Sequence, residues 1–134
     1  MPHVLSVGQC GYDHASIARS LRQAFGAVVV AADTFAEAIR TLRAGSFALV
    51  LVNRVSDARG ELGLELIRTL EADPELARIP VMLVSNFPDA QEQAQALGAL
   101  AGFGKADMHS PAAMKRIEAA LAPTPKLPRG RDLT

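Results

Sequence analysis

Between positions 47 and 53 the chain reads Phe47-Ala48-Leu49-Val50-Leu51-Val52-Asn53. A continuous apolar run of this length is typical of a strand that is buried on both faces of a parallel sheet. Segments with the helical spacing of apolar residues lie before the run, over 35–44, and after it, over 62–71. The stretch therefore predicts an α/β protein that is built around a covered parallel sheet.

The same alternation of strand and helix patterns continues on both sides of this run. Strands are predicted at 4–7, 27–31, 47–52, 81–84 and 101–104, and helices at 15–25, 35–44, 62–71, 88–97 and 111–121. Five strand–helix pairs in alternation imply right-handed crossovers and helices on both faces of one sheet. We therefore expect a doubly wound, flavodoxin-like (βα)5 fold with five parallel strands in the order 2-1-3-4-5.

The composition narrows the function classes. The 134 residues include 14 Lys and Arg against 14 Asp and Glu, and this zero net charge argues against a nucleic-acid partner. The single cysteine, Cys10, excludes an internal disulfide framework and a multi-cysteine zinc site, and it is typical of a reducing compartment. Because the chain shows no signal-peptide pattern and no apolar run of membrane-spanning length, we expect a cytoplasmic protein without a membrane partner.

The last twelve residues differ in composition from the rest. Residues 123–134 hold three prolines and three basic residues, so they cannot bury enough apolar surface to order themselves. We expect one domain over 1–122, followed by a Pro-rich basic tail or the stump of a linker over 123–134. A linker would connect the domain to an output domain of a larger regulator.

In this fold, a functional site is expected where the carboxyl ends of the strands meet. The loops concerned are those after Val7, Val52, Val84 and Phe103.

Four segments together carry a resemblance to a known family. They are the run 47–53, Gly-Leu-Glu-Leu-Ile at 63–67, Ile-Pro-Val-Met-Leu-Val-Ser at 79–85, and the stretch from Gly98 to Lys105. Their order and spacing, over about 4–121, resemble the receiver domain of bacterial two-component response regulators. The resemblance implies a CheY-like fold, phosphorelay signal transduction and a phosphorylation pocket at the carboxyl ends of the strands.

The pocket positions depart from the family's pattern. The resemblance implies two acidic residues after the first strand and a phosphorylated aspartate after the third, where this chain has Gly8, Gln9 and Asn53. Carboxylates are needed both to hold Mg²⁺ and to form an acyl phosphate. We therefore expect a degenerate pocket with no catalytic residue, no metal and no cofactor.

The remaining positions of the pattern are partly kept. Ser85 and Lys105 correspond to the residues that contact the phosphoryl oxygens in the family. With no carboxylate expected beside it, the Lys105 ammonium is predicted to bond the Asn53 carbonyl oxygen, main-chain carbonyls or solvent. Gly102 takes the place of the family's switch aromatic, and its neighbour Phe103 points to the opposite face of the strand. The loop from Asn53 to 63 is longer than the family's.

We therefore expect a pseudo-receiver that is not an enzyme and that acts without phosphorylation. Its partner would be a signalling protein, an output domain or a second copy, bound through 98–105 and the last helix. The alternative is a small-molecule or redox sensor, or an enzyme, that uses the altered pocket near Cys10 and Lys105, because a helix N-terminus favours a reactive thiol.

Histidine-based sites find less support. The pair Asp13-His14 resembles the cobalamin-binding loop of some flavodoxin-like domains, but the two residues are adjacent and no glycine follows at the required step. A polar pair in the first turn of a helix is the simpler interpretation. His3, His14 and His109 also lack the spacing of a helical metal site.

Overall fold

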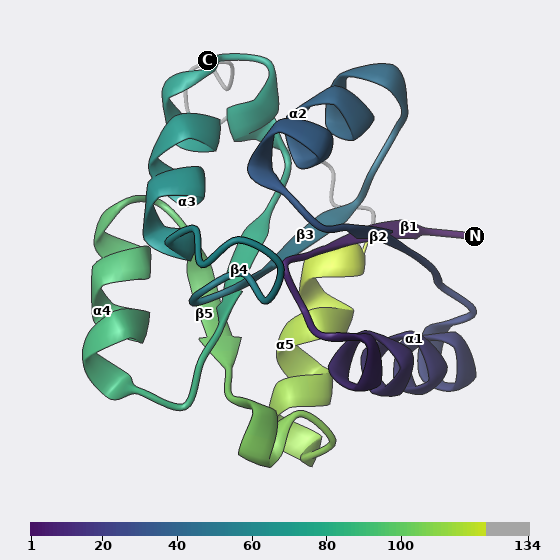
Figure 1. The fold of residues 1–134 in the computed structure, drawn as a ribbon. Helices are drawn as coiled ribbons and strands as arrows, with labels where there is room; N and C mark the ends of the chain where they lie inside the picture. The colour runs from purple at the N-terminus through teal and green to yellow at the C-terminus, as the bar shows by residue number, and fades with distance from the viewer. Residues whose placement is uncertain (123–134) are drawn as a thin grey trace, which may run out of the picture.

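The computed structural model describes residues 1–122, so the predicted tail over 123–134 lies outside the described residues. One parallel sheet runs through the molecule in the order β2-β1-β3-β4-β5 (Figure 1). Its strands are β1 (His3–Val7), β2 (Val28–Ala32), β3 (Leu49–Asn53), β4 (Val81–Val84) and β5 (Leu100–Phe103). The predicted flavodoxin-like topology is confirmed, strand order included.

Helices cover both faces of the sheet. They are α1 (Gly11–Phe25), α2 (Phe35–Ala44), α3 (Gly63–Ala72), α4 (Pro88–Ala96) and α5 (Pro111–Leu121), with short 3₁₀ helices η1 (Leu76–Arg78) and η2 (Lys105–Asp107). Helices α2, α3 and α4 pack on one face, and α1 and α5 pack on the other (Figure 1). Between residues 1 and 122, no helix is both long enough and apolar enough to cross a membrane.

The central strand β3 shows why the apolar run is continuous. Val50 and Val52 pack in the core beneath α2, α3 and α4, whereas Leu49 and Leu51 pack in the core beneath α1 and α5. Full burial of each such side chain contributes about 1.5–3 kcal/mol. Both faces of the strand therefore favour apolar residues.

Helix α1 begins earlier than its apolar pattern predicts. The predicted start was 15, but the helix begins at Gly11, and the Cys10 thiol caps it by accepting the Asp13 N–H at 3.4 Å. The first turn is polar and carries no apolar stripe, which is why the periodicity missed it. The other boundaries agree with the predictions within one or two residues.

The loop after β3 is held close to the sheet by a glycine at the start of α3. The Gly63 N–H donates to the Arg54 carbonyl oxygen at 2.7 Å. A Cβ atom at Gly63 would lie only 2.2 Å from the Asn53 carbonyl oxygen, so any other residue would push α3 away from the end of β3. The glycine thereby fixes the loop next to the candidate site.

Candidate functional site at the carboxyl ends of the strands

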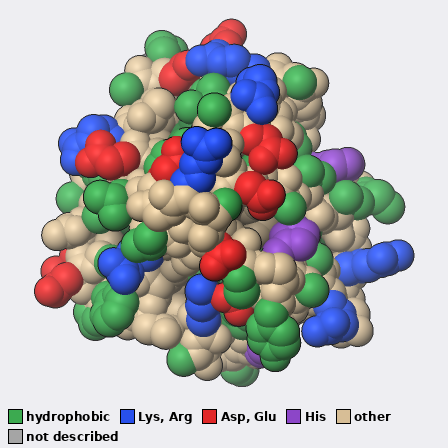
Figure 2. All heavy atoms as spheres, viewed as in Figure 1, with side chains coloured by type: hydrophobic (Ala, Val, Ile, Leu, Met, Phe, Trp, Pro, Cys, Tyr) green, Lys and Arg blue, Asp and Glu red, His purple; other side chains and the backbone are tan. Residues whose placement is uncertain are grey.

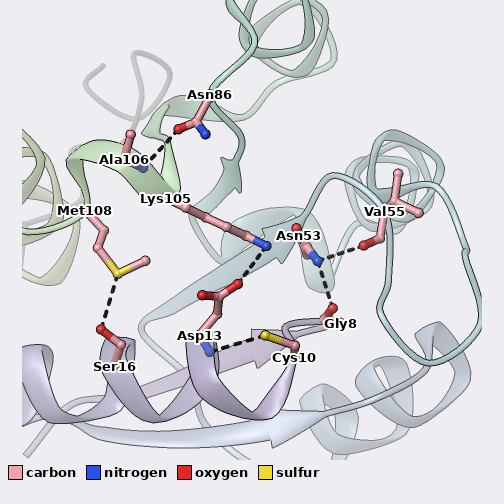
Figure 3. Close-up of polar contacts among 10 residues, drawn as sticks. All are labelled: Gly8, Cys10, Asp13, Ser16, Asn53, Val55, Asn86, Lys105, Ala106 and Met108. Carbon is pink, nitrogen blue, oxygen red and sulfur yellow. Dashed lines mark hydrogen bonds and ion pairs between the residues drawn. The ribbon is translucent and has the colours of Figure 1, made fainter.

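A hollow of about 460 Å³ lies where the loops after β1, β3, β4 and β5 meet. Its lining includes three of the five predicted site residues, namely Asn53, Ser85 and Lys105, together with Cys10 from the start of α1. The fold therefore brings these predicted residues together, as the close-up in Figure 3 shows for Asn53 and Lys105. Gly8 lies next to Asn53, whose side chain bonds its carbonyl oxygen.

Asn53 uses its amide hydrogens on the main chain. Its buried Nδ2 donates to the Gly8 carbonyl oxygen at 2.9 Å and to the Val55 carbonyl oxygen at 2.7 Å (Figure 3). A carboxylate at this position could accept hydrogen bonds but could donate none. The site is therefore built for an amide, and the side chain joins the end of β1 to the loop after β3.

The loop after β3 also covers the end of β1. The Asp57 N–H donates to the Gly8 carbonyl oxygen at 2.9 Å, and the buried Ser56 hydroxyl accepts the Glu61 N–H at 2.9 Å. Gly8 has a φ of +76°, and a Cβ atom there would lie 3.0 Å from the Ser56 Cα. The longer loop thus takes the space in which a side chain at position 8 would stand.

The prediction that Lys105 has no carboxylate beside it is wrong. Its Nζ lies 2.7 Å from Oδ2 of Asp13, so the lysine does have a carboxylate partner (Figure 3). The Asp13 side chain is 16% exposed and that of Lys105 is 38% exposed. The hydrogen bond from Lys105 lowers the pKa of Asp13 against the opposing effect of burial, and contact with Cys10 lowers it further.

Asp13 is the site residue that the sequence analysis missed. The family pattern directs attention to positions 8 and 9, whereas this carboxylate stands in the first turn of α1. The early start of α1 at Gly11 is what turns Asp13 toward the lysine. The available signal was an acidic residue early in the first helix in a chain that keeps a lysine after its last strand.

Gln9 is buried but does not form part of the hollow. The residue is 7% exposed, and within residues 1–122 neither its amide nitrogen nor its amide oxygen has a hydrogen-bond partner. It is not among the residues that line the hollow. Gln9 therefore supplies neither an acidic group nor a contact to this site.

The other end of the site is formed by β4 and β5. The buried Ser85 hydroxyl accepts the Phe87 N–H at 3.1 Å, and the Ser85 N–H donates to the Phe103 carbonyl oxygen at 2.9 Å. Phe103 packs in the core beneath α1 and α5. At Gly102 a Cβ atom would fall 2.2 Å from the Leu83 carbonyl oxygen, so this position has no room for an aromatic side chain pointing that way.

The surface charge around the site is mixed. Arg54 and Phe87 both line the hollow, and the Arg54 guanidinium lies 4.7 Å from the centre of the Phe87 ring. Figure 2 shows acidic and basic side chains interspersed over the face in view, without a patch of one sign. The face in view offers no strong field for a highly charged ligand.

The residues present do not fit a magnesium site. Mg²⁺ prefers carboxylate and other oxygen ligands, yet Gly8 and Gln9 carry no carboxylate and Asn53 directs its nitrogen at the nearby carbonyls. Asp13 is paired with Lys105. Over the described part of the chain, no group of three or more His, Cys, Asp or Glu residues is arranged to hold a metal ion.

No protein-family model and no curated protein matches the sequence. Solved structures do match the fold. A response regulator from Thermotoga maritima is similar with a TM-score of 0.74 and 23% identity, covering 90% of this chain and 98% of that one. The receiver domain of a histidine kinase from Syntrophus aciditrophicus gives 0.72 and 17%, covering 94% of each chain.

A third similar structure is the receiver domain of a DNA-binding response regulator from Colwellia psychrerythraea 34H. Its TM-score is 0.68 at 21% identity, and the match covers 79% of this chain and 87% of that one. The chain has the fold of response regulator receiver domains. At these identities the likeness extends to the fold, and the site must be judged on its own residues.

Proposed function

We propose that this receiver-like domain acts in two-component signal transduction as a protein-interaction module that does not depend on phosphorylation. The observation that carries the proposal is Asn53, whose amide donates to two main-chain carbonyls where a receiver would carry its phosphorylated aspartate. The fold likeness supports the signalling role. The module is not an enzyme and works in the cytoplasm.

The site lacks what phosphoryl transfer requires. An acyl phosphate needs a carboxylate nucleophile, and the amide of Asn53 is a poor one. The incoming phosphoryl group also needs a cation to neutralise its charge, and the residues around Gly8 do not fit that cation. The missing carboxylate nucleophile and the missing cation ligands both favour a domain that its partner recognises in a single conformation.

The surface formed by α4, β5 and α5 is the proposed interaction face. Leu100 is exposed on the edge strand β5, and the helices α4 and α5 each carry an exposed charged residue, acidic Glu92 and basic Lys115. Within residues 1–122 neither charged side chain forms an ion pair. An exposed leucine together with unpaired charges of opposite sign on α4 and α5 suits a second copy or a protein partner with complementary charges.

The phosphorylation part is tested on the full chain with acetyl phosphate and Mg²⁺, and separately with beryllofluoride and Mg²⁺. Intact mass should show no added phosphoryl group, and the amide resonances around Asn53 should not move. A receiver domain with its aspartate intact serves as the positive control. A stoichiometric acyl phosphate, or Mg²⁺-dependent shifts around Asn53, would end the proposal.

The interaction face is tested by charge reversal. Glu92→Lys should weaken self-association in sedimentation equilibrium, and adding Lys115→Glu should restore it if the partner is a second copy. If the wild type is monomeric, the same variants are compared for capture of a signalling partner, with Arg40→Glu on α2 as the control. Equal behaviour of Glu92→Lys and the control would place the partner elsewhere.

A small-molecule or redox sensor is the second candidate, because Cys10 and Lys105 line the same hollow. A ligand that binds only the folded state raises Tm by mass action. Thermal-shift measurements against nucleotides, cobalamins and thiol reagents therefore distinguish the two candidates. A saturable rise in Tm that Lys105→Met removes would favour the sensor.

A further inference from the structure

The side chain of Gln91, on α4, is bonded to two neighbouring strands at once. Its Nε2 donates to the Leu83 carbonyl oxygen at 2.9 Å and to the Ser85 carbonyl oxygen at 3.1 Å. Its Oε1 accepts the Gly102 N–H at 3.1 Å. This one half-buried amide therefore ties α4 to the end of β4 and to β5.

The bonds fall where the ladder between β4 and β5 is irregular. Met82 pairs with Leu100 and Val84 pairs with Phe103, so the register shifts between these two pairs. Such an irregularity leaves main-chain groups without ladder partners, and buried groups of this kind need another partner. Gln91 provides such a partner for the Gly102 N–H, and its Nε2 adds a hydrogen bond to the neighbouring Leu83 carbonyl oxygen.

Gly102 makes this arrangement possible. A Cβ atom there would lie 2.2 Å from the Leu83 carbonyl oxygen and 3.1 Å from Oε1 of Gln91. On the other side, Nη1 of Arg116 in α5 donates to the Gly102 carbonyl oxygen at 2.9 Å. The N–H of Gly102 is thus held from α4 and its carbonyl oxygen from α5.

We infer that Gln91, Gly102 and Arg116 form a latch that holds α4, β5 and α5 in a single arrangement. The inference rests on the proposed function and deepens it, since a face that is read without phosphorylation has to be presented in one conformation. Gln91 and Arg116 act as positioning residues, because they fix the main chain of the face. The bond to Ser85 extends the latch to the edge of the hollow.

The latch is tested by hydrogen exchange on the full chain without any partner or phosphoryl donor. Gln91→Leu keeps much of the side-chain volume but removes three hydrogen bonds, and Gln93→Leu on the exposed face of α4 is the matched control. After correction for global stability, the Gly102 amide should exchange at least ~10-fold faster in Gln91→Leu than in wild type. Gln93→Leu should leave that exchange rate unchanged.

A second pair of variants and a measurement on the wild type keep the test decisive if Gln91→Leu does not fold. Arg116→Met should add microsecond-to-millisecond line broadening at 100–104, whereas Lys115→Met should not. The wild type should show no such exchange between residues 83 and 104 in relaxation dispersion.

Unchanged Gly102 exchange in Gln91→Leu, or conformational exchange of the wild-type face, would overturn the latch. Either result leaves the absence of phosphorylation untouched. Conversely, formation of an acyl phosphate would overturn the proposed function while the protection of the Gly102 amide still reports on the latch.

Discussion

The ends of β1 and β3 differ sharply from the ends of β4 and β5. At the first pair, the amide of Asn53 and the Asp57 N–H both bond the Gly8 carbonyl oxygen, and the loop after β3 lies over it. At the second pair, Ser85 and Lys105 line the hollow from the side of β4 and β5, and within residues 1–122 no loop is bonded over them in the same way. One half of the site is closed by neutral contacts to the main chain, whereas the other keeps a charged group.

The difference separates two tasks that a receiver combines. The closed half is where a receiver would accept a phosphoryl group, and here both the carboxylates and the space for them are replaced. The open half adjoins β5 and α4, which are part of the proposed interaction face and are bonded to each other through Gln91. Under the proposed function, the closed half does no phosphoryl chemistry, while the open half keeps polar contacts beside the proposed interaction face.

The largest effect is expected for Gly8→Asp, which would restore an acidic residue to the closed half. The positive φ and the contact with Ser56 should together destabilise the fold by about 2–4 kcal/mol. Gly11→Asp is the matched control, because a Cβ atom there meets nothing within 4 Å. Gly11→Asp places an acidic side chain at the start of α1, where it should stabilise the fold by about 0.3–1 kcal/mol. Urea unfolding measures both, and an equal effect of the two variants would show that the loop is not packed on Gly8.

Asn53→Asp should give the next largest effect. The carboxylate cannot donate to the Gly8 and Val55 carbonyl oxygens, so the unfolding free energy should fall by about 1–3 kcal/mol at neutral pH. The loss should shrink in acid, where the protonated carboxyl can again donate one bond. Chemical denaturation as a function of pH is the measurement. A variant as stable as the wild type at neutral pH would mean that the amide bonds do not hold the loop.

Strand order and helix layers were predictable because they depend on patterns that many residues share. The run ending at Asn53 is apolar on both faces since both faces of β3 are covered, and this fixed the central strand. The pocket without acidic residues at Gly8 and Asn53 stays a prediction, and it did not include the carboxylate of Asp13. These predictions use only residue types and their order.

The ion pair of Lys105 with Asp13 was not predictable in the same way. It depends on the start of α1, which is set by the Cys10 cap and a polar first turn rather than by apolar periodicity. The Gln91 bonds depend on the register shift between β4 and β5, which has no sequence pattern of its own. Contacts between single side chains of different elements therefore follow from the three-dimensional structure and not from a sequence pattern.

Lys105→Met probes the open half and should have a smaller effect. Because the pair is partly exposed, its loss should cost about 0.5–1 kcal/mol at neutral pH and low salt. Lys105 lowers the pKa of Asp13, so the pair stabilises the fold above the ordinary carboxyl pKa of 3.8 and this stabilisation is lost as the pH falls through the lowered value. The difference in unfolding free energy between Lys105→Met and wild type should therefore disappear in acid. Lys115→Met should show no such difference at either pH. A difference in unfolding free energy that grows in acid would contradict the ion pair between Lys105 and Asp13.

Cys10→Ser should have the smallest effect and separates the two candidate functions. The thiol caps α1 by accepting the Asp13 N–H at 3.4 Å, and a serine hydroxyl is a better cap, so stability should rise by up to about 0.5 kcal/mol. Cys10→Ala removes the cap and should lower stability instead, which thermal unfolding of both variants measures. An interaction module should bind its partner equally well with serine, because the hydroxyl preserves the cap. If binding or signalling fails in Cys10→Ser while the fold and its stability are kept, the thiol itself carries the function and the open half is a sensor.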